Sequence, residues 1–96
     1  MFEHLYDVSE QAHVQFVGLI TERARYDFSI VFTNHFFGKP LVICMQTGRS
    51  SLLCADDLCN LDYLQQLFRL ENIQVAEELR SLLLTRLPSI EAREQY

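Results

Sequence analysis

The 96-residue chain is long enough for one hydrophobic core, and 49% hydrophobic residues with only three Gly and two Pro indicate a folded protein. The net charge is −5, from eight Lys and Arg against thirteen Asp and Glu, which disfavours a surface for duplex nucleic acid. The apolar runs are far shorter than the roughly 18 residues of a membrane-spanning helix, so we expect no membrane insertion.

The N-terminal segment and the cysteines favour a cytoplasmic location. MFEHLYDVSEQ carries acidic residues where a signal peptide carries basic ones before an apolar run. Cys44, Cys54 and Cys59 are an odd number and lack the spacing of a zinc site. We therefore expect free thiols, no metal and no other cofactor.

Two strands are predicted in the first third of the chain. Residues 26–33 alternate most clearly, with four apolar side chains on one face: Tyr26, Phe28, Ile30 and Phe32. Residues 14–21 form a less regular strand in which Phe16 and Ile20 share a face. The charged segment between the two strands is expected to be a solvated turn.

Two further strands follow, at residues 41–45 and 51–55, and both are mostly apolar. The connection at residues 47–49 contains a glycine, which is typical of a hairpin. Consecutive strands with short connections favour an antiparallel meander.

Two helices are predicted after the strands. Residues 60–68 place apolar side chains at helical spacing, and Asn60 is suited to cap that helix. Residues 72–87 carry a broader apolar stripe, made of Val75, Ala76, Leu79, Leu82, Leu83 and Leu87. Glu71 and Gln74 occupy the positions of a capping box.

Strands followed by helices predict an α+β fold, with a four-stranded antiparallel β-meander followed by two C-terminal α-helices packed on the sheet. We expect a single domain over residues 1–88. Residues 89–96 are expected to form a flexible tail.

One face of this sheet is left without a helix. If Phe16 and Ile20 meet the helices, then Val17, Leu19 and Val31 lie on the opposite face. An exposed apolar patch usually marks an interface, so these three residues are a candidate self-interface of a homodimer or a site for a protein partner. The alternative is that an N-terminal segment containing Phe2, Leu5 and Tyr6 folds over that face.

The stretch HFFGKPLV, at residues 35–42, combines aromatic, glycine and basic residues. Gly38 and Pro40 suit a turn between strands, which explains most of the stretch structurally. Phe36 and Phe37 point to opposite faces if the strand continues. A second interpretation is a candidate binding surface that stacks a base or holds an acidic peptide, made of Arg25, Phe36, Phe37, Lys39 and Arg49.

No motif of a known catalytic chemistry is present, so we expect a protein that is not an enzyme. The paired carboxylates Asp56 and Asp57 suit the start of a helical turn better than acid catalysis or magnesium binding. The sequence contains no nucleophile elbow, no phosphate-binding loop and no HExxH.

Several stretches resemble a family of small, uncharacterised cytosolic proteins of Gram-positive bacteria, a domain of unknown function. They are LYD at 5–7, FV at 16–17, RYDFSIV at 25–31, FFGKPLV at 36–42, MQTGR at 45–49, DDL at 56–58, YLQQLF at 63–68 and AEELRSLL at 76–83. The resemblance covers about residues 5–85 and implies an α+β fold. It implies no activity and no site residues, and tyrosines often replace Phe36 and Phe37 in the family pattern.

Two hypotheses about function follow. The first is a protein-interaction or regulatory module that self-associates and is not an enzyme. It would use the apolar sheet face or an acidic helix surface made of Asp62, Glu71, Glu77 and Glu78. The alternative is a binder of a small ligand or of single-stranded nucleic acid that uses the aromatic hairpin and the nearby arginines.

Overall fold

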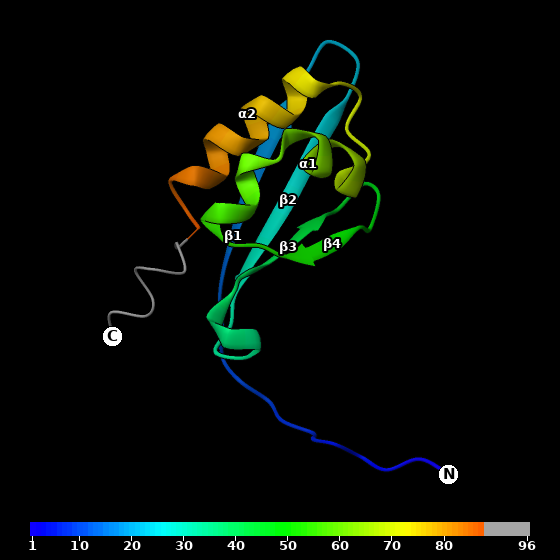
Figure 1. Cartoon of the computed structure of the whole chain (residues 1–96), viewed down its shortest axis with the longest axis vertical. Helices are drawn as coiled ribbons and strands as arrows, with labels where there is room; N and C mark the ends of the chain where they lie inside the picture. Colours follow the sequence, from blue (N-terminus) through cyan, green and yellow to red (C-terminus); the bar gives the residue numbers. More distant parts are fainter. Residues whose placement is uncertain (88–96) are drawn as a thin grey trace.

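The structure, a computed structural model, describes residues 1–87, so the predicted tail at 89–96 lies outside the described residues. The elements are β1 (His13–Ile20), β2 (Arg25–Phe32), η1 (Phe36–Gly38), β3 (Leu41–Cys44), β4 (Ser50–Leu52), η2 (Ala55–Cys59), α1 (Leu61–Phe68) and α2 (Ile73–Leu84). The sheet order is β1-β2-β3-β4, with every pair antiparallel. The predicted α+β meander with two C-terminal helices is confirmed, and both helices cover the same face of the sheet (Figure 1).

The β1–β2 register decides which side of β1 meets the helices. Val17 lies opposite Phe28, which is fully buried, and Phe16 lies opposite Ser29. Directly opposite residues of an antiparallel pair share a face, so Val17 and Leu19 pack against the core while Phe16 and Ile20 point away from it. The prediction that Val17 and Leu19 lie on the uncovered face is therefore wrong. The side of β1 that faces the core is the one that the sequence analysis placed outside, and the reverse holds for Phe16 and Ile20. Val31 does lie on the uncovered face, opposite Val14.

The core forms where the central strands meet the helices. Phe28 of β2 packs edge to face against Phe68 of α1, with ring centroids 5.3 Å apart, and both side chains are fully buried. The apolar stripe of α2 adds Val75, Ala76, Leu79 and Leu83. At one end of the core the Tyr26 hydroxyl accepts a hydrogen bond from the Glu71 backbone N–H, at 3.1 Å.

Local side-chain contacts set the helix ends. The Asn60 side chain accepts a hydrogen bond from the Tyr63 N–H at 3.0 Å, which confirms the predicted cap of α1. The cap of α2 is Asn72, which accepts from the Val75 N–H at 3.1 Å, so the capping box predicted from Glu71 is wrong. Asn is the better cap because its short side chain reaches the free amides of the first turn. The last residue of α2 is Leu84, three residues before the predicted end.

The Phe28–Phe68 contact gives a test of the core. We expect Phe68→Ala to reduce the free energy of unfolding by about 3–5 kcal/mol, because it removes a buried ring and leaves a cavity. The measurement is chemical denaturation of both proteins. Phe37→Ala, which truncates a ring that is 97% exposed, is the matched control and should change stability much less. Equal effects of the two substitutions would contradict this placement of the core.

Candidate functional site

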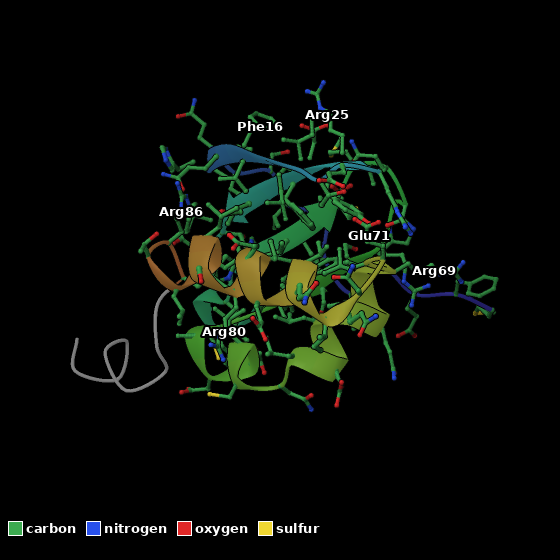
Figure 2. The ribbon with its side chains drawn as sticks, turned by 90° about the horizontal axis from the view of Figure 1, so that it is seen from above. Phe16, Arg25, Arg69, Glu71, Arg80 and Arg86 are labelled. Atoms are coloured by element: carbon green, nitrogen blue, oxygen red, sulfur yellow. The ribbon has the colours of Figure 1, made fainter. Side chains whose placement is uncertain are left out.

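The uncovered face of the sheet, here called the open face, is apolar over much of its area. Its apolar members are Val14, Phe16 and Ile20 of β1, Val31 of β2, Leu41 and Ile43 of β3, and Leu52 of β4, and Ser29 and Ser50 lie on the same face. Phe16 is 74% exposed and Ile20 is 79% exposed. Figure 2 shows Phe16 projecting from the sheet on the side away from the helices. Phe16 and Ile20 lie on the same side of β1 with Gly18 between them, and exposed apolar patches of this kind are frequent at interaction surfaces.

One end of the open face is polar. Arg25 and Asp27 form an ion pair at 3.0 Å, and the Gln46 amide donates to the Asp27 carboxylate at 2.6 Å. The hydrogen bond from Gln46, and then the one from Arg25, lower the pKa of Asp27. Arg25 also projects from this side in Figure 2. The open face therefore has an apolar centre with a charged rim, the pattern of a protein-binding surface.

The N-terminal residues 1–11 form an extended segment, here called the arm, that leaves β1 and runs away from the sheet (Figure 1). Every residue of the arm is exposed, and Phe2 and Leu5 are exposed almost completely. The alternative in which Phe2, Leu5 and Tyr6 fold over the sheet of their own chain is therefore wrong. The arm and the open face are two apolar surfaces that do not cover each other.

Glu10 anchors the base of the arm. Its carboxylate accepts a hydrogen bond from the Thr33 hydroxyl at 2.7 Å and one from the Asn34 N–H at 3.2 Å, and it contacts the His35 ring. The β1–β2 register pairs His13 with Phe32, so Glu10 stands opposite His35 if the register continues. The Tyr6 ring stacks on the His35 ring, with the two ring centroids 6.3 Å apart. These contacts fix the direction in which the arm leaves.

The aromatic pair before Gly38 lies in a left-handed turn rather than in an extended strand. Phe36, Phe37 and Gly38 have φ values of 55°, 61° and 75°. The sequence predicted the positive φ of Gly38 but not those of the phenylalanines, and the expectation that the two rings point to opposite faces of a strand is wrong. Left-handed geometry costs a non-glycine residue roughly 1–2 kcal/mol. Phe37 gains no burial free energy that would offset this strain, because its ring is exposed.

The structure does not bring the predicted ligand surface together. Arg25 begins β2, whereas Phe36 and Phe37 follow its other end, and seven strand steps of about 3.3 Å separate the two ends by roughly 23 Å. Arg49 donates to the Leu67 carbonyl, and Lys39 lies 3.7 Å from Asp57. The five candidate residues therefore fall into two groups, with Arg25 and Arg49 remote from the aromatic turn.

The predicted acidic helix surface is divided between two shallow hollows. Glu71 and Glu78 line one of them together with Glu22 of the β1–β2 turn. Asp62 lines the other, next to Asp56 and Asp57 at η2. Within residues 1–87, no three His, Cys, Asp or Glu side chains are arranged to hold a metal ion.

The remaining chemistry-bearing groups serve the fold. The Asp57 carboxylate accepts a hydrogen bond from the Cys54 N–H at 2.8 Å, which supports its predicted use at the start of a helical turn. Cys44 and Cys54 are buried and Cys59 is exposed, and all three are free thiols. None of the helices in residues 1–87 has the length and apolar character needed to cross a membrane.

The Glu10 anchor predicts a depressed carboxyl pKa. Hydrogen bonds from Thr33, then Asn34, then His35 favour the ionised form, so the pKa of Glu10 lies below its usual range. The stabilisation is complete above the pKa of Glu10 in the unfolded chain and is lost as the pH falls through the lower pKa of the folded state. We expect a pH titration of the Glu10 carboxyl resonance by NMR to show this depression and Thr33→Val to raise the pKa. An ordinary pKa in both proteins would mean that the arm is not anchored there.

Comparison with known proteins agrees with this architecture. A family model described as SAV0927-like matches residues 5–85, which include the four strands and both helices. No curated protein matches the chain. The matched span covers most of the 96 residues, and it confirms the resemblance to an uncharacterised family. The chain belongs to the SAV0927-like family.

Proposed function

We propose that this protein is an interaction module that self-associates through the open face of its sheet, works in the cytoplasm and is not an enzyme. The observation that carries the proposal is the exposure of Phe16 and Ile20 on a face that neither helix covers. A homodimer in which Phe16 and Ile20 of each subunit contact the other subunit would remove part of this apolar surface from water. Burial of apolar surface is the main driving force of association.

The layout of the open face supports a protein partner more than a small ligand. The face is a sheet surface with its apolar centre spread over all four strands, and the Arg25–Asp27–Gln46 cluster forms a polar rim at one end. Small-molecule sites are concave and bury most of the ligand. A broad face with a polar rim fits the partly flat surface of another protein.

The two carboxylates whose pKa is shifted, Glu10 and Asp27, are not suited to act as general acids near neutral pH. Glu10 and Asp27 have depressed pKa values, and in both cases hydrogen bonds to the ionised carboxylate are the largest cause. Both carboxylates are therefore held in the charged state at the surface. A carboxyl group that transfers protons near neutral pH needs its pKa raised toward the working pH.

Charge substitution on the open face tests the proposal. We expect the unmodified protein to be a dimer across a hundredfold range of concentration in light scattering. Phe16→Glu should raise the dissociation constant by roughly a hundredfold or more, because burying an unpaired carboxylate costs several kcal/mol. Leu84→Glu, at a half-exposed position of α2, is the matched control and should leave the mass unchanged. A monomer at all concentrations in the unmodified protein would refute self-association.

A second candidate function is the binding of single-stranded nucleic acid or a small aromatic ligand at η1, and the strained turn is the observation that favours it. Phe36 and Phe37 hold left-handed geometry while their rings remain exposed. Such strain is found at functional sites, where it presents a side chain in a defined position. Lys39 is next to the turn and supplies one positive charge, whereas Arg25 and Arg49 lie too far away to contribute.

Phe37→Gly tests this second candidate. We expect the variant to be as stable as the unmodified protein or more stable by up to about 1 kcal/mol, because glycine removes the left-handed strain at some cost in chain entropy. It should lose affinity for a labelled oligothymidylate measured by fluorescence anisotropy at low salt. Arg69→Gly, which relieves a φ of 55° at the end of α1, is the matched control and should keep that affinity. If the unmodified protein does not bind the oligonucleotide, this candidate is excluded for single-stranded DNA.

A further inference from the structure

Three features of one continuous stretch of chain lack a partner within the described residues. The arm exposes the apolar side chains Met1, Phe2, Leu5, Tyr6 and Val8 among acidic and polar residues. β1 is an edge strand of eight residues, so no strand pairs with its outer backbone groups. The open face carries Phe16 and Ile20 on that same strand. One pairing event gives the arm and the β1 edge a partner and covers part of Phe16 and Ile20.

β1 lacks the devices that protect edge strands from pairing. Natural edges are kept apart by lysines, prolines, bulges or short length. β1 contains no Lys, Arg, Asp, Glu or Pro, and its eight residues pair with β2 in an unbroken register from His13 to Ile20. By contrast β4, at the other edge, has only three residues. The outer edge of β1 is thus a template for an additional strand.

The sequence of the arm alternates as a strand with one apolar side. In extended backbone, successive side chains point to opposite sides. The even-numbered side holds Phe2, His4, Tyr6 and Val8, followed by the anchoring residue Glu10. The odd-numbered side holds Met1, Glu3, Leu5, Asp7, Ser9 and Gln11. The arm has the pattern of a half-buried strand although no strand within residues 1–87 pairs with it.

We propose that the arm of one subunit pairs antiparallel with the outer edge of β1 of a second copy of this chain, and that the exchange is reciprocal. This inference rests on the self-association proposed above and specifies its geometry. The two sheets then join through a pair of long strands, each formed by the arm and β1 of one chain. A two-fold axis passes between the two strands, as expected for an isologous dimer.

The pattern of the side chains selects a register in which the numbers of opposite residues add to about 22. Phe2 then lies opposite Ile20, Tyr6 opposite Phe16, and Val8 opposite Val14. Each apolar side chain on the even side of the arm meets an apolar side chain of the open face. The Tyr6–Phe16 pair is an aromatic cross-strand pair, a favourable type in antiparallel sheets.

Neighbouring registers fit less well. A shift by one residue would turn Phe2, Tyr6 and Val8 to the opposite face of the sheet. A shift by two residues, in either direction, keeps the face but places Gly18 opposite Phe2 or Tyr6. Either of those shifts also puts His4 against Phe16 or Ile20, so apolar pairs are lost.

The arm cannot reach the β1 edge of its own chain in the observed conformation. Glu10 lies in line with β1 and is bonded to Thr33, Asn34 and His35 beyond the far end of β2. The chain therefore continues in the direction of β1 and leaves the domain, as Figure 1 shows. Pairing with its own β1 would require a tight turn at the residues that Glu10 anchors. A second copy of the chain can pair with the arm without any change in the conformation of the arm.

The area is sufficient for a stable contact. Aromatic side chains bury roughly 150–250 Å² each when they are fully covered. Phe2, Tyr6 and Phe16 occur twice in the dimer, and a cross-strand pair covers each ring from one side, so the six rings account for on the order of 500 Å². The aliphatic pairs and the two stretches of paired backbone add to this, which brings the contact to the roughly 1,000 Å² that a specific interface needs.

Disulfide trapping tests the exchange and its register in the full chain. The variant is Val8→Cys with Val14→Cys, made in a Cys59→Ser background because Cys59 is an exposed thiol. Opposite residues of an antiparallel pair have Cα atoms about 4.5–5.5 Å apart, within the range that a disulfide requires. In one extended chain the two positions are separated by roughly 20 Å, so they cannot link within a subunit. We expect a covalent dimer on mild oxidation.

The matched control is Val8→Cys with Ile43→Cys in the same background. Ile43 shares the open face but lies on β3, three strand spacings from the exchanged arm, or roughly 14 Å. It should give little covalent dimer. Equal cross-linking of both pairs would overturn the proposed pairing, and so would no cross-linking in a sample that light scattering shows to be dimeric.

Tyr6→Glu distinguishes this inference from the broader proposal. Tyr6 is largely exposed and stacks on the His35 ring, so Tyr6→Glu should change the melting behaviour of the folded subunit little. If the arm is exchanged, Tyr6→Glu weakens the dimer as Phe16→Glu does. If Phe16→Glu dissociates the dimer and Tyr6→Glu leaves it intact, the open face is the interface but the arm exchange is wrong. A full chain that is monomeric at every concentration would reject both.

Discussion

The contact between Phe28 and Phe68 fixes which face of the sheet is covered, and the rest of the molecule follows from that choice. Phe28 stands on the central strand β2, and the helix that carries Phe68 can reach it from one side only. α2 packs against the same core through Leu79 and Leu83. Both α-helices pack on this face of the sheet, so the described residues contain no further α-helix that could cover the opposite face.

The open face is therefore the most prominent feature of the protein surface. Its apolar side chains would be in water in an isolated subunit, and the arm adds further apolar residues that contact little of their own domain. Two such surfaces in one short chain are costly unless they meet something. The proposed exchange of arms would bring the two into contact, because the arm continues in line with β1 and its even-numbered residues fall on the same side as Phe16 and Ile20 in extended backbone.

The strained turn at η1 is a separate feature. Phe36 and Phe37 hold a backbone conformation that favours glycine, and they stand close to Glu10 and His35 at the base of the arm. The His35 and Phe36 rings lie 6.2 Å apart, so the turn and the arm anchor form one continuous group. A ligand or partner that acts on this turn would therefore also act on the direction of the arm.

Much of the fold could be predicted because its signals are local. The alternation of Tyr26, Phe28 and Ile30 depends only on the geometry of an extended chain, and the stripe of α2 depends only on helical spacing. The Asn60 cap depends on a contact three residues away. The choice of Asn72 over Glu71 as the second cap was missed, since both residues stand at the helix start and the backbone geometry selects between them.

The candidate surfaces were harder to predict because they depend on which segments meet. β1 is apolar on both sides, so the sequence alone established a strand with two possible inner faces. Pairing of Val17 with Phe28 assigned the inner one and left Phe16 outside. Likewise Gly38 indicated a turn, but only the closed path from β2 to β3 forced Phe36 and Phe37 into left-handed geometry. Composition, charge and periodicity thus determined the class of fold and the positions of the strands and helices. The strand register and the connection from β2 to β3 decided which side chains are exposed, because both depend on contacts between distant residues.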